Sequence, residues 1–331
     1  MASDGTQLGA DSQHPCISAD GRYVSYQSMA NVTGETDHTE SDIYLYDRVE
    51  NSQRLVSRPG TSCSECVGDN RNAVISGDGL WIVFETDSLD LFTDPLLTIQ
   101  IVRYERMTGQ VEVVSVSSDD ETGDSGSEHP SISDDGRFIA FQSLAGNLTA
   151  DIDGFNYHVY LRDTVLGTTT LASKALDGTP GDNFSWYPTI SNNGEYLAFT
   201  SRAGNLVTSD LNAEYDAFVY RVGFESIERV SVASNGTEAS DGVRDFGNVH
   251  LSGDGNFATF ISDSADLAGV TGPIDYTVFI HDRSNGETVP LGPVANTGSA
   301  GQYKRTAMLN FDGSIAWVAT EQTDWLAGDS Y

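Results

Sequence analysis

Oxygen-bearing side chains alternate with other residues along two short polar segments. They are Asp210, Asn212, Glu214 and Asp216 in one segment and Asp151 and Asp153 in the other. Ca²⁺ takes about six to eight oxygen ligands from such side chains, so the spacing predicts calcium binding that stiffens these loops. Neither segment has the full ligand spacing of an EF-hand. The alternative interpretation is ordinary loop acids that form Asx-turns.

Two histidines each precede a proline at equivalent places in the sequence. They are His14 and His129; Tyr187 holds the same place in a third segment, and Arg71 or Asn72 roughly the same place in a fourth. Histidines that converge can bind a metal or act as acid and base. Since few of these places carry histidine, the alternative is a set of polar residues that cap strand starts.

Trp186 and Tyr187 form an adjacent aromatic pair beside Asp182 and Asn183. An exposed pair of this kind can stack on a sugar ring, because each ring offers an apolar face and a polar edge. The alternative is a tryptophan that fills the gap between two sheets.

The cysteines allow three interpretations. Cys63 and Cys66 lie in one loop, and Cys16 follows His14 closely. A secreted protein would form a disulfide between Cys63 and Cys66, or from Cys16 to either of them. The thiols could instead be free, or the three cysteines and His14 could bind zinc.

The charge of the chain is strongly negative. The formal net charge is -32 and the isoelectric point is about 4.1. Such a surface repels nucleic acid and anionic membranes and attracts cations. It also suits a protein adapted to salty water, as in a halophilic or marine organism. No apolar run is long enough to span a membrane, so neither nucleic-acid binding nor membrane insertion is expected.

A short turn sequence recurs along the chain at intervals of about 58 residues. Its copies are Asp20-Gly21, Asp78-Gly79, Asp135-Gly136, Asn193-Gly194, Asp254-Gly255 and Asp312-Gly313. This periodicity predicts a single domain made of repeats at approximately 14–70, 71–127, 128–185, 186–246, 247–305 and, in part, 306–331.

Each repeat contains four strand signals and no helical period. In the third repeat they are 130–133, 138–143, 158–163 and 168–173, and the glycine of the turn allows a tight hairpin. Four antiparallel strands repeated radially predict an all-β fold, a β-propeller. We expect six blade positions, with five full blades and two strands of a last blade that residues of a larger polypeptide would complete. The alternative is five blades with a two-stranded tail.

The repeats resemble those of TolB-like β-propellers, in particular an extracellular bacterial variety with the pattern ISxDGRYVAFxS…NL…D…DVFVRDRxTGxTxxVS. Compare CISADGRYVSYQS from Cys16 and SISDDGRFIAFQS from Ser131. The resemblance extends from about residue 14 to residue 328. It implies the propeller fold and an extracellular, cell-surface or periplasmic location. Some relatives of this fold are lyases, but their metal-binding histidine set is not visible in this sequence.

The lengths of the expected connections indicate where a ligand would bind. The connections from second to third strand and from each fourth strand to the next blade are long, and both emerge at the same end. Binding residues concentrate on such loops, so we expect a protein or polysaccharide ligand at this long-loop face, near Trp186, Tyr187, His14 and His129.

No nucleophile elbow, phosphate loop or zinc-protease motif occurs in the sequence. We therefore expect a non-enzymatic, secreted or surface-exposed binding or scaffold propeller, stabilised by calcium and without another cofactor. The alternative is a polysaccharide-acting hydrolase or a metal-dependent lyase with its site at the mouth of the central channel.

Overall fold

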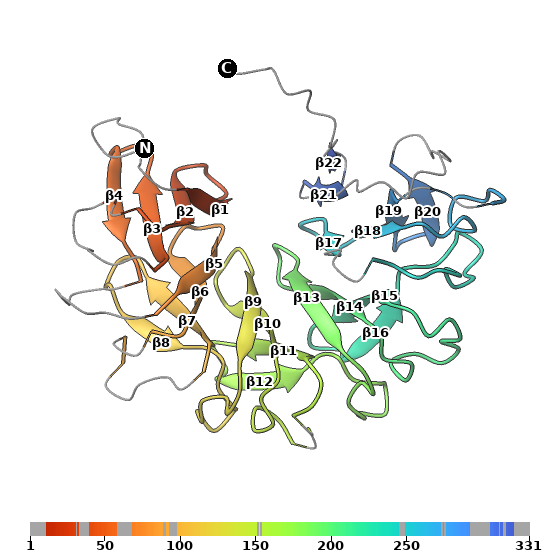
Figure 1. Cartoon of the computed structure of the whole chain (residues 1–331), viewed down its shortest axis with the longest axis horizontal. Coiled ribbons are helices and arrows are strands. Elements are labelled where there is room, and N and C mark those ends of the chain that lie inside the picture. Colours follow the sequence, from red (N-terminus) through yellow and green to blue (C-terminus); the bar gives the residue numbers. More distant parts are fainter. Residues whose placement is uncertain are drawn as a thin grey trace. The chain divides into compact units, whose positions relative to one another are not determined.

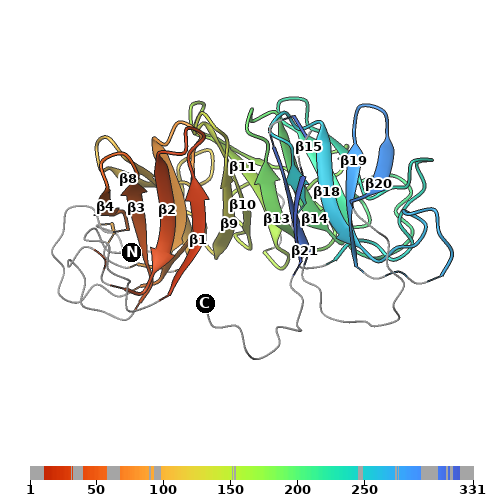
Figure 2. The same ribbon diagram turned by 90° about the horizontal axis from the view of Figure 1, so that it is seen from above.

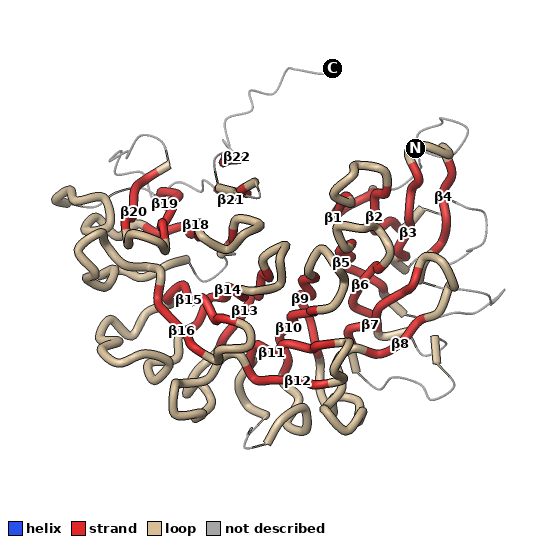
Figure 3. Tube along the Cα trace, turned by 180° about the vertical axis from the view of Figure 1, so that it is seen from behind, coloured by secondary structure: helices blue, strands red, loops and turns tan. Residues whose placement is uncertain are grey.

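The computed structural model describes residues 11–30, 32, 40–57, 68–88, 91–92, 98–150, 152, 154–244, 249–272, 274, 276–291, 305–310, 312–313 and 316–320. Every regular element in this part of the chain is a β-strand (Figure 3). The described residues include no helix that is long and apolar enough to cross a membrane. The predicted all-β class is confirmed.

Five four-stranded antiparallel sheets and one two-stranded sheet make up the fold. Each four-stranded sheet keeps its strands in chain order, so its first and fourth strands form the two edges. This arrangement is the blade of a β-propeller. The predicted five full blades followed by two further strands are confirmed.

The chain forms two compact units, Met1–Ala172 and Ser173–Tyr331. The first unit contains blades one to three (Figure 1). Blade one consists of β1 (Ser12–Ile17), β2 (Tyr23–Ser28), β3 (Asp42–Asp47) and β4 (Ser52–Leu55). Blade two consists of β5 (Asn70–Ile75), β6 (Trp81–Thr86), β7 (Gln100–Glu105) and β8 (Val111–Val113). Blade three consists of β9 (Ser127–Ile132), β10 (Phe138–Ser143), β11 (His158–Asp163) and β12 (Thr168–Leu171).

The second unit contains blades four and five and the two-stranded sheet. Blade four consists of β13 (Ser185–Ile190), β14 (Tyr196–Ser201), β15 (Asp216–Arg221) and β16 (Ser226–Arg229). Blade five consists of β17 (His250–Leu251), β18 (Phe257–Ser262), β19 (Thr277–Asp282) and β20 (Glu287–Pro290). The last sheet pairs β21 (Arg305–Leu309) with β22 (Ala316–Thr320).

The turn between the first and second strands depends on a serine and an aspartate, with Asn193 in place of the aspartate in blade four. In blade one the Ser18 hydroxyl donates to Asp20 Oδ1 (2.6 Å), and the same oxygen accepts the amide of Arg22 (2.9 Å). Gly21 donates its amide to the Ser18 carbonyl (2.8 Å) and has a φ of 70°. Glycine adopts this conformation at little cost, which explains why the turn sequence repeats.

The same glycine also receives an aromatic ring from the preceding blade. A Cβ added to Gly79 would lie 2.6 Å from the ring of Tyr23, and a Cβ added to Gly136 would lie closer than 3.0 Å to the ring of Trp81. Gly255 with Tyr196 and Gly313 with Phe257 repeat the arrangement in the second unit. We call this contact the ring joint. Only glycine leaves room for the ring.

A second joint lies in the first strands, each of which has a bulge in blades one to four. The bulge holds a non-glycine residue with positive φ: His14 (50°), Asn72 (53°), His129 (54°) and Tyr187 (55°). In the first unit the bulge amide binds the preceding blade. The amide of Asn72 donates to Gln27 Oε1 (2.9 Å), and that of His129 donates to Glu85 Oε1 (2.7 Å). We call this contact the bulge joint.

Candidate functional site

The long connections of blade four gather several charged side chains around one buried arginine. Residues 202–215 join β14 to β15, and residues 230–249 join β16 to β17. Antiparallel order places both connections at the same end of the blade, and the other end has tight turns (Figure 2). The unequal loop lengths agree with the expectation from the sequence.

A buried charge cluster lies beneath these two connections. Asp210, Asp216 and Glu238 each bring a carboxylate oxygen to within 4.8 Å of the others. A terminal nitrogen of Arg229 lies 3.8 Å from Asp210 Oδ1 and 3.3 Å from Asp216 Oδ2, and forms an ion pair with Glu238. The Arg229 and Asp210 side chains are only 10% and 4% exposed. The cation among these carboxylates is therefore the guanidinium of the protein itself.

The charge cluster fixes the loop above it. Glu238 accepts the amide of Leu211 (3.2 and 3.1 Å), and the Asn212 amide nitrogen donates to the Ala239 carbonyl (2.9 Å). Within the loop, Ser209 and Ala213 have φ values of 76° and 56°. Such conformations persist only when surrounding contacts enforce them, and they are common at ligand sites.

Burial and crowding of negative charge raise the pKa of two of these carboxyl groups. Desolvation, with repulsion from Asp216 as the next cause, raises the pKa of Asp210 to about 6, and Arg229 only partly offsets this. Desolvation also raises the pKa of Asp216, against a hydrogen bond from Ser231. Perturbed carboxyl groups of this kind mark functional sites as well as structural ion pairs.

Some contacts of the charge cluster recur in other blades, and others are found in blade four alone among the described blades. The serine after β4 donates to Asp42 at the start of β3 (2.7 Å), and the serine after β8 donates to Gln100 at the start of β7 (2.6 Å). Asp216 with Ser231 therefore repeats a structural pair. Arg229 does not repeat, because its strand position holds an apolar residue in the other blades: Leu55, Val113, Leu171 and Pro290.

Aromatic rings line the same end of blade four. Trp186 stacks with Phe184 (5.3 Å between centroids) and with Tyr215 (5.6 Å), and meets Tyr187 edge-on (6.4 Å). All four rings are half-buried. The predicted pair of Trp186 and Tyr187 thus belongs to a larger aromatic cluster, and Tyr215 connects this cluster to the loop above the charges.

Two polar pockets flank the loop of residues 202–215. One, of about 380 Å³, lies between blades four and five. Its lining comprises Asn212, Glu214, Tyr215, Ser240, Asp241, Val243, Arg244, Asp263 and Tyr276. The other, of about 430 Å³, is lined by Asp182, Asn183, Arg202, Gly204, Asp210, Leu211 and Ala213. Rings beside convergent polar groups are typical of small-ligand sites.

The four alternating residues that were proposed as calcium ligands do not form one group in the structure. Asp210 and Asp216 come together, whereas Glu214 is exposed and lines the first pocket. Asn212 Oδ1 accepts the Glu214 amide (2.8 Å), as in an Asx-turn. Glu238 and Arg229 were not expected from the sequence. Alignment of the repeats alone would have identified Arg229, as a charge at an otherwise apolar position.

The two histidines occupy equivalent bulges, as their sequence context indicated, and Asn72 rather than Arg71 holds that place in blade two. His14 is exposed and His129 is half-buried. Among the described residues, neither belongs to a group of three side chains close enough to share a metal ion. The backbone amide of His129 serves the bulge joint.

The structure describes one of the remaining predicted residues, Cys16. Cys63, Cys66, Asp151 and Asp153 lie outside the described residues. Cys16 forms no disulfide, is half-buried against the core of blades one and two, and has a thiol pKa raised by burial.

Comparison with known proteins establishes the fold. Neither a protein-family model nor a curated protein sequence matches the chain. Among solved structures, putative TolB from Agrobacterium tumefaciens is similar, with a TM-score of 0.52 and 18% identity over 96% of this chain and 92% of that one. An oligogalacturonate lyase in complex with manganese is also similar, with a TM-score of 0.57 and 11% identity over 94% of this chain and 74% of that one.

The β-propeller domain of the Trilobed protease from Pyrococcus furiosus gives a TM-score of 0.54 and 12% identity, over 96% of this chain and 79% of that one. The fold of the chain is thus that of TolB-like β-propellers, as the resemblance of the repeats implied. Propellers with this fold occur in proteins of different function.

Proposed function

We propose that the chain is a binding propeller, secreted or exposed at the cell surface or in the periplasm, whose ligand is a polysaccharide held at the long-loop end of blades four and five. One observation carries the proposal: the pocket of about 380 Å³ has the rings of Tyr215 and Tyr276 in its lining, together with carboxylate, amide and hydroxyl groups. Sugars need this combination, because their apolar faces stack on rings and their hydroxyl groups need polar partners.

The setting of the pocket supports ligand binding. The loop that carries Tyr215 is tied to Glu238 and Ala239, and the amide of Val243 donates to the Tyr215 carbonyl (2.6 Å). A loop held in place before the ligand arrives loses less entropy on binding. The position of Trp186 against Tyr215 extends the aromatic surface beyond the pocket.

Calcium would act beside this function by stiffening loops. In blade four the guanidinium of Arg229 lies where a cation would bind, so we place calcium at carboxylates other than Asp210, Asp216 and Glu238. A rise in melting temperature with Ca²⁺ that Mg²⁺ and NaCl do not reproduce would support this role.

A polysaccharide-acting hydrolase or metal-dependent lyase is the second candidate. The observation in its favour is the positive φ of His14 and His129, because strained conformations concentrate at active sites. The binding proposal accounts for more of the structure, since the bulge joint already explains the backbone at His129.

The proposal is tested by titrating the protein with a panel of neutral and acidic polysaccharides in a calorimeter. Tyr215→Ala and Trp186→Ala should each weaken binding by about tenfold or more, as loss of an aromatic contact does. Phe224→Ala is the matched control, because Phe224 is exposed on the same blade after β15, at the end that carries tight turns. Unchanged binding by Tyr215→Ala would contradict the proposal, and release of reducing ends would support the enzyme.

A further inference from the structure

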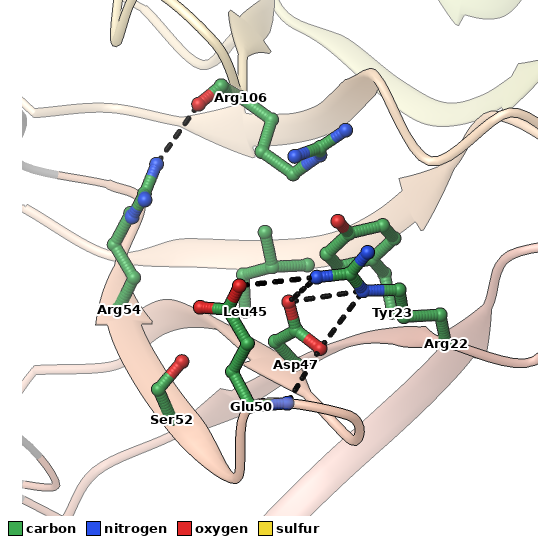
Figure 4. Close-up of a pocket in the computed structure, with 8 residues that line it drawn as sticks. All are labelled: Arg22, Tyr23, Leu45, Asp47, Glu50, Ser52, Arg54 and Arg106. Atoms are coloured by element: carbon green, nitrogen blue, oxygen red, sulfur yellow. Dashed lines mark hydrogen bonds and ion pairs between the residues drawn. The ribbon is translucent and has the colours of Figure 1, made fainter.

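Three arginines line a small pocket at the opposite end of the blades, between blades one and two. Arg22 precedes β2, Arg54 lies in β4, and Arg106 follows β7. Tyr23, Leu45, Asp47, Glu50 and Ser52 complete a pocket of about 170 Å³ (Figure 4). Three guanidinium groups in one pocket are unexpected in a chain with 17 basic residues and a net charge of -32.

The two carboxylates of the pocket neutralise only one of these arginines. Asp47 accepts from Arg22 Nε (3.0 and 3.1 Å) and from its terminal nitrogen (2.7 Å), and Glu50 accepts from the same terminal nitrogen (3.3 Å). Figure 4 shows Asp47 and Glu50 turned toward Arg22. The lining side chains therefore carry an excess of one positive charge.

Arg54 and Arg106 bind neutral groups instead. A terminal nitrogen of Arg54 donates to the Arg106 carbonyl (2.9 Å) and to the hydroxyl of Tyr104 (3.3 Å). Arg106 Nε donates to the Gly79 carbonyl (2.7 Å), and its guanidinium lies over the ring of Tyr23, 4.2 Å from the centroid. Within the described chain neither guanidinium forms a salt bridge.

Blades four and five show how the repeat neutralises the equivalent arginine. Arg283 follows β19 as Arg106 follows β7, and it lies over Tyr196 (4.1 Å) as Arg106 lies over Tyr23. Arg283 Nε pairs with Glu228. Glu228 opposes Val219 in the third strand, just as Arg54 opposes Leu45. Arg54 thus stands where the second unit has the neutralising glutamate.

We infer that the pocket between blades one and two binds an oxyanion, a carboxylate or sulfate group of an acidic ligand. A guanidinium pairs with such groups through parallel N–H donors, and Arg54 and Arg106 each retain N–H groups beyond those already bonded. The volume of about 170 Å³ suits a small anionic group rather than a drug-sized molecule. The site is independent of the polysaccharide pocket, since it lies in the other unit.

The probes are sodium sulfate and sodium malonate, titrated calorimetrically into the full chain at an ionic strength held constant with NaCl. We expect one or both to bind, and Arg54→Glu to weaken that binding at least tenfold. Arg54→Gln, the second variant, should weaken it less but measurably. Arg283→Gln is the control and should change affinity by less than twofold, because Glu228 already neutralises Arg283.

Arg54→Glu should also fold normally, with a melting temperature in NaCl equal to or above that of the unmodified protein. The new glutamate would pair with Arg106 as Glu228 pairs with Arg283. Binding of sulfate alone or malonate alone would support the site and identify its anion. Binding of neither, equal affinity in Arg54→Glu, or an equal loss in Arg283→Gln would overturn the inference.

Discussion

Replacement of Gly136 by alanine tests the ring joint. Gly136 has a φ of 72°, and a Cβ there would lie closer than 3.0 Å to the ring of Trp81 in the preceding blade. Gly167, in the same blade, has a φ of 68° and no atom within 4 Å of the position of a Cβ. The two glycines share a backbone conformation and differ in the ring contact.

The magnitude follows from these two contributions. Alanine in the left-handed region costs about 1–2 kcal/mol, so the free energy of unfolding should fall by this amount in both variants. At Gly136 the ring of Trp81 must also move out of contact, and overpacking of this kind costs a further ~1–3 kcal/mol. We therefore expect Gly136→Ala to destabilise the protein by about 2–5 kcal/mol and Gly167→Ala by about 1–2 kcal/mol.

Urea unfolding followed by tryptophan fluorescence measures both values, with slopes compared to check that unfolding stays cooperative. A double variant with Trp81→Leu should remove most of the additional loss at Gly136, since the ring that the methyl group displaces is gone. Equal destabilisation by the two single variants, or no coupling to Trp81, would refute the ring joint.

Two further outcomes concern the charge cluster of blade four. Arg229→Met should destabilise the protein by about 3–5 kcal/mol at pH 7, because it leaves buried carboxylates without their cation; urea unfolding measures this, and exposed Arg221→Met should stay within about 1 kcal/mol. The raised pKa of Asp210, about 6, means that the folded state binds its proton more tightly than the unfolded chain. Its contribution should therefore favour folding by about 1 kcal/mol more at pH 5 than at pH 7, an increment that Asp210→Asn should abolish. Asp47 should change stability with pH in the opposite direction. Its pKa is about 2, lowered first by the hydrogen bond from Arg22, so the stability it contributes is lost only as the pH falls below about 4.

The sequence predicts the fold because each blade is determined by local signals. The turn of Ser18, Asp20 and Gly21 forms from residues close in the chain. In the third repeat, the second and third strands begin and end at the predicted residues, 138–143 and 158–163. The fourth strand ends at Leu171, earlier than the predicted Ser173, although the amide of Ala172 still donates to the Val159 carbonyl of the third strand.

The sites were less predictable because they depend on which blades face each other. Nothing near Glu238 in the sequence indicates that it meets Asp210 of another connection and Asp216 of β15. Likewise, Arg54 and Arg106 become neighbours only when blades one and two pack together. Alternating carboxylates within one segment were visible, but the loop conformation sends Glu214 and Asp216 in different directions.

The ring joint and the bulge joint have a consequence for how such a protein can evolve. At the four described ring joints the ring is a tyrosine, a tryptophan or a phenylalanine, and its partner is the turn glycine of the next sheet. The bulge joint consists of a backbone amide in one blade and the side-chain oxygen of a glutamine or glutamate in the preceding blade. The ring joint recurs within both units with the same turn glycine, and the bulge joint recurs within the first. We therefore expect that a duplicated blade can keep these contacts to its neighbour while its loops diverge.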